Sequence, residues 1–428
     1  MRLLDTKLHQ LNDVISAITA RASEIEHQIQ SIVRDVIADV RARGDEALLQ
    51  LGRKFDCPTL SELQVSDAEV DEACASIRQE LLEAIRTAKA NILAFHERQR
   101  QNSWVEVTDK YIYGQIVKPI GTVGIYAPAG LAPYPSTVLM TAVPARIAGV
   151  PRVIMCTPPQ KDGKVNPVML AAARECGITE IFKVGGAQAI AAMAYGTQSV
   201  PRVDKIVGPG SAYVNEAKRQ VFGDVGIDQL AGPSEILIVA DESADPTYVA
   251  ADLLSQAEHG EDASCVLVTT SRDLVRGVQE EIEKQTQLHS RADLVRKSLE
   301  NFGFIVVCSS LEECLTISNA YAPEHLELMV RDPWEALKRV RNAGSIMLGP
   351  MTPVPLCDFA AGPNHTLPTG QTARFSSPLG VEDFVTKSGI LSYTQEALNE
   401  IAPTVIELAS AEGFEAHANT VRIRLSKG

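Results

Sequence analysis

The segment TVGIYAPAG, residues 122–130, decides the fold class because it joins a short apolar strand to the loop before a helix. The same alternation of strand and helix then repeats along the chain. Short apolar strands that alternate with helices predict a parallel sheet covered by helices on both faces. In this first series we expect strands over 122–126, 152–156, 180–184, 205–207 and 234–240, and helices over 136–147, 167–176, 187–195 and 212–221.

A second series of the same kind follows and predicts a duplicated α/β, nucleotide-binding-like fold. Its expected helices are 246–259, 274–287, 311–320 and 334–342, and its expected strands are 265–270, 304–308, 326–330 and 345–348. Residues 1 to about 100 carry helical stripes, including one expected helix over 67–99, and strands are expected over 104–126. The pattern breaks into a Pro/Gly-rich loop over 349–377, and we expect the tail from 381 to be helical.

The composition describes a globular protein and excludes several classes of partner. With 428 residues the chain is long enough for two or three domains. A net charge of -14 argues against nucleic acid and anionic membranes, which need a basic surface. No apolar run approaches the roughly 20 residues that span a bilayer, and the first residues do not resemble a signal peptide. Eight scattered cysteines without a CxxC pair are typical of a reduced, cytoplasmic protein.

The expected helix 246–259 ends in the segment SQAEHG, residues 255–260, with Asp245 as a candidate cap. Gln256 and His259 are three residues apart, so their side chains share one face of the last turn. An amide and an imidazole in this arrangement could hold a metal or a polar substrate. Taken alone, however, the pair is more simply explained as an ordinary solvated helix end.

Two glycine-rich loops follow strands of the first series, at 185–188 (GGAQ) and 208–211 (GPGS). In parallel sheets ligands bind at the carboxyl ends of strands, and glycine before a helix lets backbone N–H groups approach phosphate oxygens. The two loops together favour a nucleotide site. Tight turns also need glycine, however, and G-x-G-x-x-G is absent.

Two further loops contain acid–base residues, at 322–325 (APEH) and 357–369. Glu324 and His325 are common proton-transfer groups, but on an extended segment their side chains point to opposite faces unless the loop bends. A capped turn with a surface histidine is the alternative for either loop. Gln256, His259, Asp358 and His417 offer atoms that zinc prefers, without a diagnostic spacing.

Seven motifs together resemble the histidinol dehydrogenase family, in the family's order from about residue 30 to the C-terminus. They are 185–191 (GGAQAIA), 208–210 (GPG), 231–235 (AGPSE), 255–260 (SQAEHG), 321–326 (YAPEHL), 362–369 (GPNHTLPT), and Glu412-Gly413 with Ala416-His417. The resemblance implies a zinc- and NAD-dependent oxidation of L-histidinol to L-histidine through L-histidinaldehyde. This reaction uses two NAD+ and is the last step of histidine biosynthesis.

The resemblance also implies an organisation of two tandem, incomplete Rossmann-like doubly wound domains with helical terminal segments. Residues 1–25 would be an N-terminal helical segment, and 126–235 the NAD-side domain. The first Rossmann-like domain, with the metal and catalytic residues, would combine 26–125 and 236–379. The homodimer of the family implies shared active sites, with the C-terminal segment 380–428 completing the partner's site.

The family's functional positions carry over residue by residue, with one zinc per subunit. The implied roles are acid–base catalysis by Glu324 and His325, NAD contact by Tyr126, Gln188 and Ser211, zinc ligation by Gln256, His259, Asp358 and His417, and substrate contact by Ser234, Gln256, His259, His325, Asp358, His365, Glu412 and His417.

Three positions depart from the family pattern. Ser211 replaces a common Asn, Ala129 replaces a Gly, and Cys357 replaces a usual Gly. The first two put the strength of NAD binding in question, and the third adds a thiol beside a proposed zinc ligand. Two alternatives remain: a dehydrogenase of another polyol or amino alcohol on the same scaffold, and a non-catalytic nucleotide-responsive binding protein.

Overall fold

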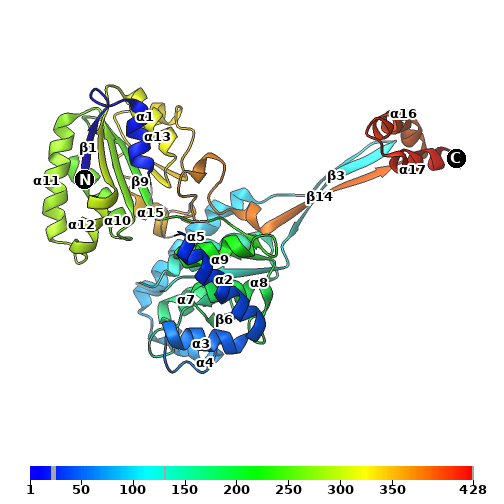
Figure 1. Cartoon of the computed structure of the whole chain (residues 1–428), viewed down its shortest axis with the longest axis horizontal. Coiled ribbons are helices and arrows are strands. Elements are labelled where there is room, and N and C mark those ends of the chain that lie inside the picture. Colours follow the sequence, from blue (N-terminus) through cyan, green and yellow to red (C-terminus); the bar gives the residue numbers. More distant parts are fainter. Residues whose placement is uncertain (21–25, 130–131, 427–428) are drawn as a thin grey trace.

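Two parallel sheets and an antiparallel arm organise the structure, a computed structural model that describes residues 1–20, 26–129 and 132–426 (Figure 1). The first sheet has six parallel strands in the order β1-β11-β10-β9-β12-β13. Its four central strands are buried along their whole length, as strands covered on both faces are. The strands are β1 (Arg2–Asp5), β9 (Glu235–Ala240), β10 (Ser264–Thr269), β11 (Gly303–Val307), β12 (His325–Met329) and β13 (Ser345–Leu348).

The second sheet has five parallel strands in the order β6-β5-β4-β7-β8. They are β4 (Thr122–Tyr126), β5 (Arg152–Thr157), β6 (Glu180–Lys183), β7 (Lys205–Val207) and β8 (Gly226–Ile227). In each unit the chain begins at a central strand (β9 or β4) and adds the next two strands outward on one side of it. It then crosses to the other side of the central strand and adds the last two strands there. This shared order confirms the predicted duplicated, Rossmann-like doubly wound architecture.

Helices cover both sheets. Those that pack on the six-stranded sheet are α1 (Leu11–Thr19), α10 (Pro246–Ala257), α11 (Arg272–Gln287), α12 (Ala292–Phe302), α13 (Leu311–Tyr321), α14 (Pro333–Leu337) and α15 (Val354–Phe359). Those that pack on the five-stranded sheet are α2 (Glu26–Arg43), α3 (Asp45–Phe55), α4 (Asp67–Ser76), α5 (Gln79–His96), α6 (Pro135–Ala148), α7 (Pro167–Glu175), α8 (Gly186–Tyr195) and α9 (Ala212–Val221).

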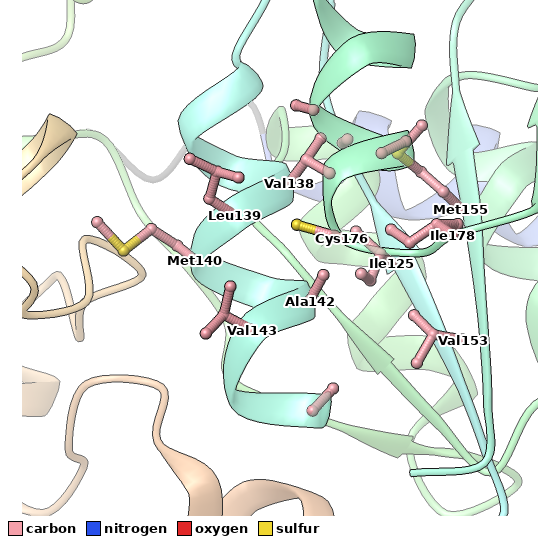
Figure 2. Packing of buried hydrophobic residues seen from close by; sticks show 14 of the residues in the cluster. Ile125, Val138, Leu139, Met140, Ala142, Val143, Val153, Met155, Cys176 and Ile178 are labelled. Atoms are coloured by element: carbon pink, nitrogen blue, oxygen red, sulfur yellow. The ribbon is translucent and has the colours of Figure 1, made fainter. Parts of the chain in front are cut away.

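Helix α6 is buried almost all round, because protein elements cover both of its sides. Figure 2 shows Val138 and Ala142 pointing toward Ile125 and Val153 on the strands, with Val143 on another side of the helix. Helix α5 and residues 381–384 pack against α6 in the same apolar cluster. Each fully buried aliphatic side chain here contributes about 1.5–3 kcal/mol, so α6 is held rigidly. Its amino end lies next to the candidate site.

The N-terminal part differs from the sequence expectation. Residues 2–5 form strand β1 at the edge of the six-stranded sheet, where a helical segment 1–25 was expected; residues 21–25 lie outside the described part. The helices within 26–96 pack on the five-stranded sheet, whereas the expected division grouped 26–125 with 236–379. The expected helix 67–99 is two helices, since Ile77 and Arg78 are extended.

A long arm projects from the two units (Figure 1). Strand β3 (Tyr111–Pro119) pairs antiparallel with β2 (Trp104–Val107) and with β14 (Val385–Tyr393), and the arm ends in α16 (Gln395–Ala411) and α17 (Glu415–Ser426). Strand β14 was missed in the sequence, where residues from 381 were expected to be helical. Within the described residues, no helix combines the length and apolar character needed to cross a membrane.

Candidate active site

The end of α10 supplies the first two side chains of the site. Asp245 caps the helix by accepting a hydrogen bond from the Thr247 N–H at 2.8 Å, as the sequence predicts. Gln256 is 1% exposed, whereas His259, just past the helix, remains open to solvent although other protein groups surround it. The helix end therefore presents one buried amide and one accessible imidazole, and it is not an ordinary solvated terminus.

Glu324 and His325 lie together at the amino end of β12. Ala322 adopts a left-handed backbone (φ 51°), which turns the chain sharply between α13 and the strand. Because of this bend the two side chains approach one another, with 3.7 Å between Glu324 Oε2 and His325 Nδ1. Sequence reasoning placed ligand-binding loops at the carboxyl ends of strands, so this location at the amino edge of the six-stranded sheet is a correction.

Asp358 and His365 come from the segment that crosses between the units. Asp358 lies on the short helix α15, in a region where no regular structure was expected, and its Oδ1 is 3.3 Å from His325 Nε2. His365 Nδ1 is 2.9 Å from the Asp358 carbonyl oxygen, and its Nε2 is 3.3 Å from Thr137 Oγ1 at the start of α6. The site therefore joins the two sheets.

Glu235, the first residue of β9, is a site residue that sequence reasoning missed. Its N–H donates to Glu324 Oε2 at 2.8 Å, and its own carboxylate accepts from the N–H groups of Glu324 and Gly370 at 3.3 and 3.0 Å. Its carbonyl oxygen lies 3.0 Å from His325 Nδ1, which identifies Nδ1 as the protonated ring nitrogen. An acidic residue that opens the apolar strand EILIVA is the signal that could have revealed it.

The charges of this cluster depend strongly on one another. Burial raises the pKa of Glu324 to about 8, against the opposing effect of His325. Burial lowers the pKa of His325, but Glu324 and Asp358 outweigh it and raise that pKa to about 9. Burial also opposes ionisation of Asp358, yet its hydrogen bond with His325 keeps its pKa below the usual value. Neighbouring protein groups partly desolvate the His259 ring, although its edge stays exposed, and this lowers its pKa, so the ring is neutral near pH 7.

The three expected NAD-contacting residues lie at the carboxyl edge of the five-stranded sheet. Tyr126 ends β4, and its hydroxyl accepts a hydrogen bond from the Gly186 N–H at 3.0 Å. Gln188 is buried above Gly186 in the first turn of α8, while Ser211 precedes α9 and is exposed. They flank the point where the strand order reverses between β4 and β7, which is the usual ligand position in such sheets.

A buried ion pair holds the loop that contains Ser211. Lys218 and Asp228 are 1% and 2% exposed and contact each other. Lys218 Nζ donates to the Gly208 carbonyl oxygen at 3.0 Å, and Asp228 accepts from the Gly208 N–H at 2.7 Å. Gly208 has φ +117°, and a Cβ there would lie 2.1 Å from the Tyr126 carbonyl oxygen. Only glycine fits this position without distortion.

The departures from the family pattern are accommodated locally. Ala129 is not among the described residues with a positive φ, so it needs no strained backbone; Gly130, in the same loop, lies outside the described part. The Cys357 thiol is buried 3.3 Å from Ser345 Oγ, and burial raises its pKa to about 11. It is therefore a neutral thiol and a poor ligand. The Ser211 side chain caps nothing and is available to a ligand.

Two of the expected residues, Glu412 and His417, are not brought to the cluster. Both are exposed at the end of the arm, which projects away from α10 and α15 (Figure 1). The His417 ring packs against Phe414, with 5.2 Å between ring centroids. Ser234, in contrast, directly precedes β9 beside Glu235, where its backbone oxygen accepts from the Ser264 N–H at 2.9 Å.

The donor set at the end of α10 suits zinc chemically. Gln256 Nε2 is buried without a hydrogen-bond partner, and rotating the amide would place its oxygen there as a ligand. A neutral His259 and an ionised Asp358 add the nitrogen and oxygen donors that zinc prefers. Across the described residues no three His, Cys, Asp or Glu side chains gather into a metal cluster.

A doubly wound scaffold with a buried acid–base pair between its two units defines the class: an α/β enzyme. A family model described as histidinol dehydrogenase matches residues 19–425. The histidinol dehydrogenase of Geobacter sulfurreducens is 49% identical, with 99% of this chain and 100% of the relative covered. That of Bacillus cereus is 47% identical, with full coverage of both chains.

A solved structure supports the same assignment. The histidinol dehydrogenase of Elizabethkingia anophelis has a TM-score of 0.93 at 37% identity and covers 100% of this chain and 98% of its own. The chain belongs to the histidinol dehydrogenase family and is an oxidoreductase.

Proposed function

We propose that this enzyme oxidises L-histidinol to L-histidine through L-histidinaldehyde, with one zinc per subunit and two NAD+ per substrate, as the last step of histidine biosynthesis. The intact acid–base cluster of Glu324, His325 and Asp358 in a member of this family carries the proposal. Eight free cysteines support placing the reaction in the cytoplasm, where thiols stay reduced.

Gln256, His259 and Asp358 would hold the zinc together with His417 of a second copy. When bound, zinc would hold the imidazole and amine of the substrate and neutralise Asp358, while NAD would accept the hydride. Ser234, His365 and Glu412 would contact the substrate. Tyr126, Gln188 and Ser211 would contact NAD.

His325 is the general base of the first step. The carbonyl oxygen of Glu235 fixes the proton on Nδ1, so Nε2 is the atom that takes the hydroxyl proton of the alcohol. Glu324 raises the pKa of His325 most, and the Asp358 carboxylate adds to it; with that carboxylate held by zinc, the second contribution would be lost and Nε2 would become a better base. The alcohol loses this proton and a hydride, which leaves the aldehyde and NADH.

Glu324 acts in the second step, where the aldehyde must gain water to become a diol. Its carboxylate takes a proton from the water as the oxygen attacks the carbonyl carbon, and His325 returns the proton it took in the first step to the carbonyl oxygen, which completes the diol. The diol then loses a proton to His325 and a second hydride to a fresh NAD+, which yields the carboxylic acid. The raised pKa of Glu324 suits a group that accepts and returns a proton near neutral pH.

A second copy of the chain would complete the site as a homodimer with shared active sites. The arm exposes large apolar side chains that no described element of the same chain covers, including Val105, Val107, Leu391, Leu408 and Phe414. His417→Ala mixed with Glu324→Gln tests this sharing, since subunit exchange should restore one intact site in each mixed dimer. No recovery of activity would contradict shared sites.

The number of NADH molecules formed per histidinol tests the reaction itself. Two per substrate supports the proposal, and one per substrate would indicate a simple alcohol dehydrogenase. No NADH from histidinol, but NADH from another polyol or amino alcohol, would reassign the substrate. Zinc analysis of the purified protein tests the metal independently of turnover.

A further inference from the structure

Two carboxylic side chains that this chemistry does not use, Asp252 and Glu327, face each other behind the site. They are 7% and 1% exposed. Asp252 lies on α10 one turn before Gln256. Glu327 lies on β12 two residues after His325 and therefore on the same face of the strand. Two acids in contact in the protein interior need a specific explanation, because unpaired buried charge is strongly unfavourable.

Glu327 is also bonded to a third element. Its Oε1 accepts a hydrogen bond at 3.0 Å from the N–H of Val354, the first residue of α15. Its Oε2 is buried and has no donor if both acids are ionised. A proton on Oε2 removes this conflict, because it is donated to Asp252 while Oε1 still accepts from Val354. One shared proton thus satisfies the pair.

The charge environment agrees with this assignment. Burial and the neighbouring charge of Asp252 raise the pKa of Glu327 well above its ordinary value. Burial raises the pKa of Asp252 to about 6, and its hydrogen bond with Glu327 works in the opposite direction. At neutral pH the proton therefore resides on Glu327, and Asp252 is the carboxylate that accepts it.

We propose that the proton-sharing pair of Glu327 and Asp252 is a positioning device that ties α10 and α15 to β12, so that their side chains converge on the metal. One bond from Glu327 reaches α10 and the other reaches the start of α15. These helices carry Gln256 and Asp358, which no direct hydrogen bond within the described residues connects. The inference rests on the proposed function, since it assumes zinc at these ligands.

The isosteric variant Glu327→Gln separates this role from a need for the carboxyl group itself. Its amide oxygen accepts from Val354 and its N–H donates to Asp252, so it should bind zinc as the wild type does. Glu327→Met keeps the length of the side chain but removes both bonds. Zinc affinity should then fall by about 10–100-fold, the usual effect of losing a group that orients metal ligands.

Zinc affinity is measured by competition with a chromophoric chelator, and the absorption spectrum of the cobalt-substituted protein reports ligand geometry. Val266→Ala on β10 is the control, because it weakens the opposite apolar face of the same sheet without touching the pair. It should lower stability and leave both metal readouts unchanged. Asp252→Ala leaves no unpaired charge, because Glu327 carries the proton and is neutral. This variant therefore tests the bond between Glu327 and α10 even if Glu327→Met does not fold, and we expect about tenfold weaker zinc binding.

Wild-type zinc affinity in Glu327→Met or Asp252→Ala would overturn this inference and leave the proposed function standing. Zinc binding by Glu327→Gln as weak as that of Glu327→Met would overturn the shared proton. A wild-type protein that binds no zinc would instead overturn the metal site of the proposed function, and this inference with it.

Discussion

Replacing Glu324 with Gln should abolish the second oxidation and yet stabilise the metal-free protein at alkaline pH. The side chain is 7% exposed, and its Oε2 accepts the Glu235 N–H at 2.8 Å, a bond that the oxygen of a Gln amide can also accept. The variant therefore keeps the local structure. It removes a group that burial makes difficult to ionise, as its pKa of about 8 shows.

The sign and size of the effect follow from proton linkage. The pKa of Glu324 rises from 4.5 in the unfolded chain to about 8 in the folded protein, so the folded state binds more protons between these values. Stability from this group is present at low pH and is lost as the pH rises from about 4.5 to about 8. At 1.36 kcal/mol per pH unit the upper limit is about 5 kcal/mol. The variant also loses the attraction between the Glu324 carboxylate and His325, so we expect a smaller gain of about 1–3 kcal/mol for the variant at pH 8.

Urea unfolding of the chelator-treated proteins at pH 5, 6, 7 and 8 measures this gain. The difference between Glu324→Gln and wild type should be near zero at pH 5 and grow toward pH 8. Glu335→Gln, on the exposed helix α14, is the control and should show no such trend. A pH-independent difference would refute the assigned protonation, and two NADH per histidinol from Glu324→Gln would refute its role in the second step.

Three further predictions concern the cofactor loop and the metal. Gly208→Ala should destabilise the protein by about 1–3 kcal/mol in urea unfolding. Gly223 also has a positive φ (+107°), but a Cβ there would meet no atom within 4 Å. Gly223→Ala should therefore destabilise the protein less, since no clash adds to the backbone strain. Lys218→Met leaves the buried carboxylate of Asp228 unpaired, so it should lower the free energy of unfolding by about 3–5 kcal/mol and weaken NAD binding in a titration. Lys338→Met breaks an exposed ion pair and should change both quantities little. Free zinc at 100 times its dissociation constant should raise the free energy of unfolding by about 2.7 kcal/mol, and His259→Ala should lose this increment. Equal effects in a variant and its control, or a zinc increment that survives His259→Ala, would contradict the corresponding assignment.

The sequence predicts most strands and helices of the two α/β series, because their burial is visible in their own residues. It places 234–240 in the first series, whereas β9 lies in the six-stranded sheet, and it does not predict β8 or α12. It misses β1, because four residues pair with a strand about 300 positions away and only that pairing makes them a strand. It misses β14, since most of that strand is exposed or half-buried and lacks an apolar alternation. An apolar stripe on a helix also does not say which sheet the helix covers, so α2 to α5 were grouped with the wrong one.

The contacts within the candidate active site also depend on the folded structure and could not all be predicted from the sequence. Glu324 and His325 can be recognised as an acid–base pair, but their approach depends on the left-handed residue Ala322, and no alternation rule predicts that bend. Glu235 is visible only as an acid at the start of an apolar strand. Its two-way hydrogen bonding with Glu324 depends on β9 and β12 being neighbours, which is a property of the folded sheet.

The two units have the same strand order, but their ligand-binding positions differ electrostatically. At the carboxyl edge of the five-stranded sheet, α8 and α9 present their amino ends, whose positive partial charge suits the phosphates of a dinucleotide. At the amino edge of the six-stranded sheet, α10 presents its carboxyl end, whose negative partial charge suits a cation beside Gln256 and His259. The contact between His365 and Thr137 joins these opposite edges. The proposed NAD and zinc sites would therefore lie on either side of one substrate, because the two copies of the scaffold meet by opposite edges of their sheets.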